Sequence, residues 1–193
     1  MSNPPDAGGI AFRRRPGMFI TDFDGTLLTD EKNIQQKDLN TLARLKTLGV
    51  VTAIATGRSL FSFQRALDQM GLNQKDLPVD YLIFSTGAGI YCLNRDMVIR
   101  SHSVDRDDIR KITDYFDHKR IDYMVHQAIP DTHYFIYKCH GVESKNPDFH
   151  HRISLYPAFG KPMEVSTAPF DRATEVLAII PGGLERDQVR GVQ

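Results

Sequence analysis

Residues Met18 to Leu28 constrain the fold of this chain more than any other stretch, because an apolar run ends there in two closely spaced carboxylates. Asp22 closes the apolar run and Asp24 follows two residues later, just before Gly25. Residues i and i+2 of a strand point to the same face, so the two acids repel each other unless something positive lies beside them. A strand that opens into a glycine-containing turn also presents free backbone N–H groups, which suit an anion. The stretch therefore predicts a site for a metal-bound phosphate.

Apolar strands alternate with amphipathic helices in the first half of the chain. We expect strands at 18–22, 50–55 and 81–84, and helices at 39–48 and 59–70. This alternation predicts a doubly wound, parallel α/β core of the Rossmann-like type. Apolar residues on both faces of the first strand are typical of a central strand that helices cover on either side.

The pattern changes after the third strand, and the remaining residues predict an α+β unit inserted there. We expect a hairpin at 90–100, a helix at 105–119, strands at 123–126, 134–139 and 175–180, an irregular polar segment at 140–159, and the start of a helix at Leu184. The chain then divides into a flexible leader at 1–17, the core at 18–87 and the α+β unit at 88–193.

Two further polar stretches follow core strands. Thr56, Gly57 and Arg58 come directly after the second strand, and Thr86 and Gly87 come after the third. In a parallel α/β sheet, ligands bind at the carboxyl ends of the strands, so these residues are expected near the two aspartates. A helix N-cap at Thr56 and a plain turn at Gly87 are the structural alternatives.

The run Asp22-Phe23-Asp24-Gly25-Thr26-Leu27-Leu28 resembles the Asp-x-Asp-Gly-Thr-Leu-Leu signature of haloacid dehalogenase (HAD) superfamily phosphatases. The resemblance implies that Asp22 attacks phosphorus, and that Asp24 protonates the leaving oxygen and later activates water. It also implies that Mg²⁺ is bound by a carboxylate oxygen of Asp22 and the backbone carbonyl of Asp24. A Thr at the end of the second strand, here Thr56, matches a second motif of the superfamily.

By the same resemblance, Gly25, Thr56, Gly57 and Arg58 are the expected phosphate-binding residues, although Arg58 is equally compatible with a solvated helix start. The α+β unit resembles the cap domain of the Cof-like branch, which includes sugar-phosphate phosphatases and closes over small phosphorylated metabolites. Thr86 and Gly87 fall at the expected hinge, where the branch usually has Asn in place of Thr.

The resemblance covers residues from Met18 onward, and two later motifs of the superfamily have no match: a Lys, and a Gly-Asp-x-x-Asn-Asp segment. We therefore expect the N-terminal half of the core with most of a cap, weak or absent phosphatase activity, and an apolar unpaired edge on the first strand. A complementing C-terminal fragment is a possible partner. A non-catalytic phosphate-binding module and a phosphomutase are the alternative functions.

Composition narrows the partners. Lys+Arg and Asp+Glu both total 24, so the chain lacks the basic excess of a general nucleic-acid or membrane-surface binder. The two cysteines suggest neither a disulfide framework nor a zinc site. No apolar stretch is long enough to span a bilayer, and the first 17 residues lack the apolar core of a signal peptide, so a cytoplasmic location is expected.

The histidines do not form a predicted site. His140, His150 and His151 lack metal-ligand spacing, and His126 and His133 flank a hairpin turn where surface positions are usual. Lys145 and Lys161 are candidates for facing a substrate from the cap, but the sequence does not place them.

Overall fold

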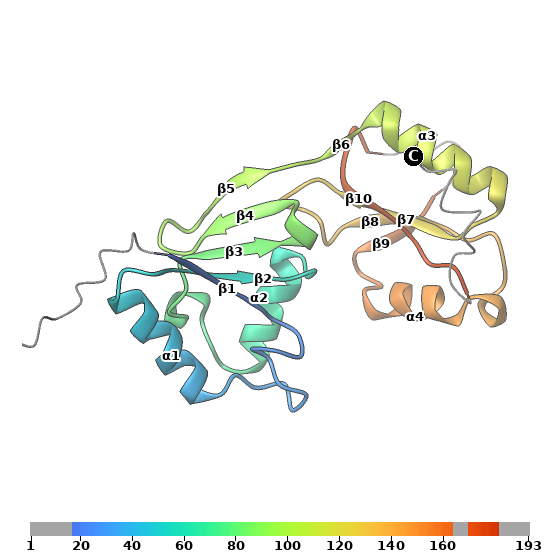
Figure 1. Cartoon of the computed structure of the whole chain (residues 1–193). Helices are drawn as coiled ribbons and strands as arrows, with labels where there is room; N and C mark the ends of the chain where they lie inside the picture. Colours follow the sequence, from blue (N-terminus) through green and yellow to red (C-terminus); the bar gives the residue numbers. More distant parts are fainter. Residues whose placement is uncertain (1–16, 164–169, 182–193) are drawn as a thin grey trace, which may run out of the picture.

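The computed structural model describes residues 17–163 and 170–181, which form two units, each built on its own five-stranded sheet (Figure 1). The first sheet has the order β1-β2-β3-β4-β5, with β1 (Met18–Asp22), β2 (Val51–Ala55), β3 (Tyr81–Phe84), β4 (Gly89–Cys92) and β5 (Met97–Ser101). The second has the order β6-β10-β7-β8-β9, with β6 (Val104–Asp105), β7 (Tyr123–Gln127), β8 (Phe135–Lys138), β9 (Gly160–Pro162) and β10 (Arg172–Ala178). The helices are α1 (Gln36–Thr47), α2 (Leu60–Gln69), α3 (Arg106–Lys119) and α4 (Pro147–Leu155), with short 3-10 turns η1 (Gln74–Asp76), η2 (Ser85–Gly87) and η3 (Glu143–Lys145).

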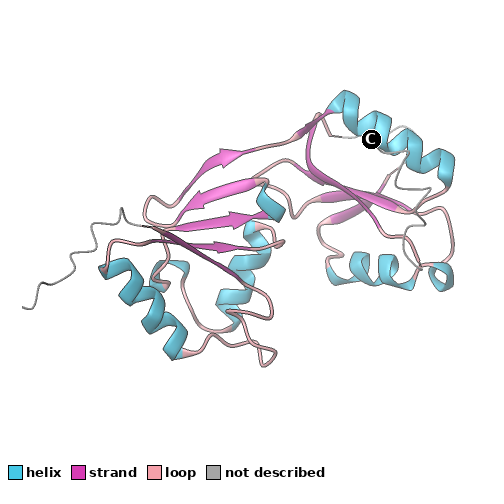
Figure 2. Cartoon of the chain, in the orientation of Figure 1, coloured by secondary structure: helices cyan, strands magenta, loops and turns pink. Residues whose placement is uncertain are grey.

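The register of the first sheet brings the predicted site segments to one edge. Strands β1, β2 and β3 are parallel, with Asp22 opposite Ala55 and Ala55 opposite Ile83. The loops that follow these three strands therefore leave the sheet side by side. Helices α1 and α2 lie on the same side of the sheet (Figure 2), as two successive crossovers of one hand require.

The core of the first unit lies between this sheet and its two helices. Phe23, Phe63 and Phe84 are fully buried there, and the rings of Phe23 and Phe63 lie 4.8 Å apart. The apolar spacing of α2 matches the expected helix, and Ser59 caps it by accepting a hydrogen bond from the backbone N–H of Ser62 at 3.1 Å. The α/β class expected from the sequence is confirmed.

Strand β1 differs from expectation. Among the described strands it pairs only with β2, so it is an edge strand rather than a central one. Met18, Phe19 and Ile20 are 59%, 41% and 48% exposed, because neither a further strand nor a second layer of described residues covers them. The expected unpaired apolar edge is therefore present in this part of the chain.

The second unit has three layers, with its sheet between α3 and α4. Alternation along β7 explains this arrangement: Tyr123 and Val125 pack with Ile109 of α3, whereas Met124 packs with Phe149 of α4. Successive strand residues point to opposite faces, so a strand of continuous apolar residues can support a helix on each side.

The hairpin was expected in the second unit, but its strands pair with the first sheet. Strand β4 is antiparallel to β3, and β5 to β4, so residues 89–101 extend the first sheet. The division at 87/88 remains a prediction about domains, and the sheet pairing favours a boundary near His102.

The segment 140–159 was expected to be irregular, and that expectation is wrong. Residues 147–155 form α4, with Pro147 at its first position. Proline at that position lacks only an N–H that would be unpaired in any case, so it begins the helix and does not break it. The expected leader and the helix from Leu184 lie outside the described residues. None of the described helices combines the length and apolar character needed to cross a membrane.

Candidate active site

The loop after β1 places two acids toward solvent around a buried aromatic anchor. Phe23 is fully buried, whereas Asp22 and Asp24 on either side of it are exposed. Gly25 has φ +74°, a left-handed conformation that glycine adopts without strain, and the backbone N–H of Leu28 donates to the carbonyl of Phe23 at 2.7 Å. This tight turn keeps both carboxylates at the edge of the sheet.

Asp24, Thr56 and Arg58 form one hydrogen-bonded network. Arg58 Nη2 donates to Asp24 Oδ1 at 2.7 Å, and Arg58 Nε donates to Oδ2 at 2.9 Å. Thr56 Oγ1 donates to Asp24 Oδ2 at 3.4 Å and accepts from the backbone N–H of Arg58 at 3.1 Å. The guanidinium also lies over the ring of Phe23, 5.6 Å from its centroid. The segment after β2 is thus joined directly to the loop after β1.

This network sets the charge of Asp24. Hydrogen bonds from the Arg58 side chain hold the pKa of the Asp24 carboxyl below its ordinary value, and they outweigh partial burial, which acts in the opposite direction. The same contact raises the pKa of Arg58. In this arrangement Asp24 is a carboxylate, so donating a proton would require the Arg58 contact to loosen.

The loop after β3 completes the cluster through a strained backbone. Ser85 and Thr86 have φ of +49° and +54°, values that residues with a side chain seldom adopt, and Gly87 follows at +94°. Thr86 N–H donates to the carbonyl of Thr56 at 3.2 Å. A Cβ placed on Gly57 would lie 3.7 Å from Thr86 Oγ1, which is an ordinary contact distance. The strain is thus found where the loop after β3 contacts the loop after β2.

Two oxygen donors at the end of β1, the Asp22 carboxylate and the Asp24 backbone carbonyl, are of the kind that a hard divalent cation prefers. Within residues 17–163 and 170–181, no hydrogen bond or ion pair involves the Asp22 carboxylate, and no group of three or more His, Cys, Asp or Glu side chains is placed to hold a metal. The turn uses the carbonyls of Phe23 and Leu28 and leaves that of Asp24 unused among the described contacts. One carboxylate and one carbonyl, completed by water, suit Mg²⁺, which keeps several waters in protein sites.

The structure brings most of the predicted site residues together. Asp24, Thr56, Gly57, Arg58 and Thr86 are connected by the contacts above, and Asp22 is positioned beside them by its register with Ala55. Gly25 differs, because its N–H donates to the carbonyl of Leu28 at 3.0 Å and is therefore not free for an anion in this structure.

A cavity beside this cluster involves residues that the sequence analysis did not assign to a site. It lies between α2 and the second unit, and Phe61, Tyr156 and Glu175 contribute to its lining. His126 and His133, which were expected at surface positions, are half-buried and also line it. Only Glu175, a single acid within an apolar strand, carried a signal that could have been noticed.

Comparisons with known proteins find relatives of this chain. The sequence profile of the family described as haloacid dehalogenase-like hydrolase matches residues 19–166. The 5-amino-6-(5-phospho-D-ribitylamino)uracil phosphatase YitU of Bacillus subtilis is 27% identical over 133 residues, which are 68% of this chain and 47% of that protein. An HMP-PP phosphatase of Escherichia fergusonii is 33% identical over 79 residues, which are 41% of this chain and 27% of that protein.

Solved structures support the fold. BT1666 from Bacteroides thetaiotaomicron, described as a phosphatase of the HAD superfamily, superposes with a TM-score of 0.59 at 18% identity, covering 83% of this chain and 54% of that one. This chain therefore spans about half, or less, of the length of these three proteins.

Proposed function

We propose that this chain, which belongs to the haloacid dehalogenase-like hydrolase family, carries the nucleophile side of a site that hydrolyses small phosphomonoesters. The observation that carries the proposal is the joining of Asp24, Thr56 and Arg58 at the edge where Asp22 ends β1. Two carboxylates, a hydroxyl and a guanidinium at one sheet edge provide a nucleophile, a proton carrier and cationic contacts for a phosphoryl group.

Asp22 is the proposed nucleophile. Its carboxylate has no partner among the described residues, so an oxygen is free to attack phosphorus while the bond from phosphorus to the leaving oxygen breaks. Water then attacks the phosphorus of the aspartyl-phosphate, which releases phosphate and restores Asp22.

Asp24 is the proposed proton carrier. It would give a proton to the leaving oxygen in the first step and take one from water in the second. Arg58 opposes the first role by holding Asp24 ionised. A phosphate group that competes for the N–H groups of Arg58 would release this hold, so substrate binding and proton transfer would be coupled.

Thr56, Gly57 and Arg58 are the proposed phosphate contacts, and Thr86 and Gly87 border them. Gly25 belongs to this set only if its turn opens, because its N–H is engaged within the turn. Asp22 and the carbonyl of Asp24 would hold Mg²⁺, which would offset the negative charge of the nucleophile and the phosphate.

Small phosphorylated metabolites, including sugar phosphates, are the proposed substrates. The named relatives act on such molecules by their descriptions, and the second unit would close over them as a cap. The chain lacks a match to the Lys and Gly-Asp motifs expected from the resemblance, so the decisive test has to read binding as well as turnover.

Calorimetric titration with orthovanadate, in the presence and absence of Mg²⁺, tests the proposal on the wild type, Asp22→Asn and the control Asp30→Asn. We expect Mg²⁺-dependent binding in the wild type and the control, and its loss in Asp22→Asn. Asp30 is a matched control because it is an exposed acid in the following loop. Binding that depends on neither Mg²⁺ nor Asp22 would favour a non-catalytic phosphate-binding module, and no binding at all would overturn both functions.

Turnover of p-nitrophenyl phosphate is measured in parallel. A rate above about 1 s⁻¹, which is ordinary for an intact enzyme, would show that these residues suffice for catalysis. Loss of that rate in Asp22→Asn would assign it to this site.

A further inference from the structure

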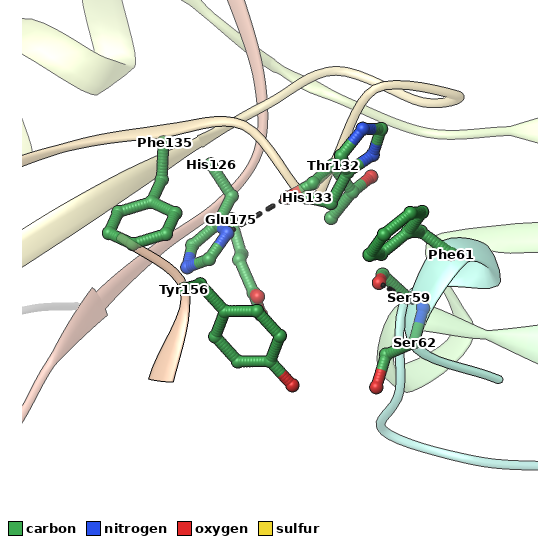
Figure 3. A pocket seen from close by; sticks show the side chains of 9 residues that line it. All are labelled: Ser59, Phe61, Ser62, His126, Thr132, His133, Phe135, Tyr156 and Glu175. Carbon is green, nitrogen blue, oxygen red and sulfur yellow. Dashed lines mark hydrogen bonds between the residues drawn. The ribbon is translucent and has the colours of Figure 1, made fainter. Parts of the chain in front are cut away.

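The cavity between the two units is built from side chains of both. Helix α2 contributes Phe61 and Ser62 together with its N-cap Ser59, and the facing unit contributes His126, Tyr156 and Glu175 among others. Figure 3 shows Phe61 facing the group formed by Tyr156, His126 and Glu175 across this space. We call it the interface cavity.

The interface cavity adjoins the proposed phosphate site through Arg58. Arg58 Nη1 lies 3.4 Å from Ser62 Oγ, which lines the cavity, while Nη2 and Nε of the same guanidinium contact Asp24. A phosphoryl group held at Arg58 would therefore direct the rest of its molecule toward this space.

Aromatic rings form much of the wall. Phe61 stacks on His133 with centroids 4.5 Å apart and an interplanar angle of 17°, and Phe159 packs edge-on to both rings at 5.0 and 5.1 Å. Tyr156 lies under the guanidinium of Arg65, 5.9 Å from its ring centroid. These contacts fix ring positions on both sides, so the wall is suited to stacking against a flat ligand.

The volume suits one ring. The cavity measures about 140 Å³. A cavity of about 150 Å³ in an engineered protein takes up one benzene molecule, so a single six-membered ring fits here.

The polar side chains favour a ligand that donates hydrogen bonds. Glu175 and His126 are cross-strand partners in β10 and β7, so their side chains leave the same face of the sheet. His126 Nδ1 lies 2.9 Å from the carbonyl oxygen of Thr132, and because that oxygen only accepts, Nδ1 carries the hydrogen and Nε2 is left for a ligand. Within the described residues, Glu175 has neither an ion pair nor a side-chain hydrogen bond.

We propose that the interface cavity binds the leaving group of the substrate, and that this group is a single flat ring carrying N–H donors that hydrogen-bond to Glu175. The inference rests on the proposed phosphatase function and narrows its substrates from small phosphorylated metabolites in general to those whose leaving group is such a ring. A carboxylate only accepts hydrogen bonds, and two parallel N–H donors on a planar nitrogen heterocycle match it in a bidentate manner. A sugar offers hydroxyl donors without a π face, so it would use Glu175 and gain less from the aromatic wall than a flat ring does.

Binding of three unphosphorylated probes separates these features: 2-aminopyridine (ring with N–H donors), benzyl alcohol (ring without them) and D-glucose (hydroxyls without an aromatic ring). Dissociation constants are read from NMR shifts of the histidine and aromatic signals of the 193-residue chain. We expect 2-aminopyridine to bind about tenfold more tightly than benzyl alcohol, and glucose to give no saturable shift. Tighter binding of glucose, or no saturable binding of either ring compound, would overturn the proposal.

Glu175→Gln removes the charge and keeps the shape. We expect it to weaken 2-aminopyridine binding about tenfold and to leave benzyl alcohol binding unchanged. Glu143→Gln, the same change at an exposed position in η3, is the matched control and should alter neither. Phe61→Leu should weaken both ring compounds. Equal 2-aminopyridine affinity in wild type and Glu175→Gln would refute the assigned role of Glu175.

The vanadate titration described above distinguishes failure of this inference from failure of the proposed function. Mg²⁺-dependent vanadate binding without 2-aminopyridine binding would refute the ring-binding cavity alone. Glu175-dependent binding of 2-aminopyridine without vanadate binding would refute the phosphatase function and the leaving-group role together.

Discussion

The guanidinium of Arg58 and the carboxylate of Asp24 form a two-pronged ion pair, with Nη2 2.7 Å from Oδ1 and Nε 2.9 Å from Oδ2. The pair joins the start of α2 to the loop after β1, two segments separated by more than thirty positions in the sequence. Because the contact lowers the pKa of Asp24, it determines how readily this acid carries a proton. Arg58 therefore has a measurable electrostatic role even in the absence of a ligand.

Replacing Arg58 should raise the pKa of Asp24. In Arg58→Gln we expect the Asp24 carboxyl to titrate nearer its ordinary value of about 3.9, because the main cause of the lowered pKa is removed. A ¹³C NMR titration of the side-chain carboxyl measures this. Arg65→Gln, within the following helix α2 and over Tyr156, is the control and should leave the Asp24 titration unchanged. An unchanged Asp24 pKa in Arg58→Gln would contradict the assigned cause.

The stability effect of the same change should be small. Asp24 is 45% exposed and Arg58 27% exposed, so solvent screens the pair and its contribution is at most about 1 kcal/mol. A carboxyl with a lowered folded pKa stabilises the fold above its unfolded pKa, and the contribution is lost as pH falls through the folded pKa. Any difference in urea stability between wild type and Arg58→Gln should therefore be largest near neutral pH and shrink in acid.

Asp80 is expected to matter more for stability. Its carboxylate accepts from the N–H of Thr52 at 2.9 Å and from Asn94 at 3.2 Å, and it lies 3.0 Å from Lys46 Nζ. Partial burial raises the pKa of Asp80, but these partners outweigh it and the net shift is downward. Asp80→Asn should lower the free energy of unfolding by about 1–3 kcal/mol at pH 7. Asp68→Asn, an exposed acid on α2, is the control.

The pH dependence of this variant has a defined sign. Because the folded pKa of Asp80 is lowered, its contribution is complete above the unfolded value of about 3.9 and is lost as pH falls through the folded pKa. The gap between wild type and Asp80→Asn in urea unfolding should therefore narrow below about pH 4. A gap that stayed constant down to pH 3 would contradict the ionic origin of the effect.

Gly89 marks a close approach between the two units. A Cβ there would lie 2.8 Å from Ile129 Cδ1 and still closer to the ring of Phe84, which is fully buried. Gly89→Ala should therefore lower the free energy of unfolding by about 1–3 kcal/mol through overpacking. Gly57→Ala is the matched control for stability, since its nearest neighbour would lie at an ordinary 3.7 Å. Equal thermal midpoints for the two variants would show that the Phe84 ring moves aside.

Local sequence patterns predicted the elements of the first unit because each of its helices and strands follows one simple rule. Ser59 was a visible helix start, and the apolar runs at 50–55 and 81–84 were visible strands, because capping and burial act over a few residues. The apolar pattern of β1 alone indicated a central strand, and its edge position was expected only from the motifs missing relative to the superfamily, because strand order depends on which other strands pair with it. The helix that begins at Pro147 was not predicted for a related reason. Whether proline begins or interrupts a helix depends on its place within the helix.

The candidate site divides in the same way. Asp22 and Asp24 could be identified because their spacing and the following Gly25 are adjacent in sequence. The ion pair of Arg58 with Asp24 depends on the rotamer of Arg58 and on the register of β1 with β2. Neither can be read from the local sequence. The interface cavity combines α2 with strands more than sixty residues later, so Phe61 and Glu175 carried no common signal.

The exposed edge of β1 should promote self-association. Strand edges with unpaired backbone groups and apolar side chains are sites where chains pair with one another. Ile20→Lys places a charge on this edge, and we expect it to reduce concentration-dependent association, which sedimentation velocity would measure. Leu48→Lys is the control, because Leu48 is 68% exposed but follows α1 and belongs to no strand. An equal effect of the two variants would indicate nonspecific hydrophobic association of the surface and not strand pairing.

Phe61 should couple the unfolding of the two units. It belongs to α2 of the first unit, yet its ring stacks on His133 at 4.5 Å and meets Phe159 edge-on at 5.0 Å in the second. Aromatic pairs contribute about 0.5–1.5 kcal/mol each beyond burial, so Phe61→Ala should remove about 1–3 kcal/mol of coupling. We expect calorimetric unfolding to separate into two transitions in this variant. Tyr115→Ala, which removes an aromatic ring from α3 next to Phe116, should shift the stability of the second unit without separating the transitions. A single transition in Phe61→Ala would show that contacts other than this ring join the units.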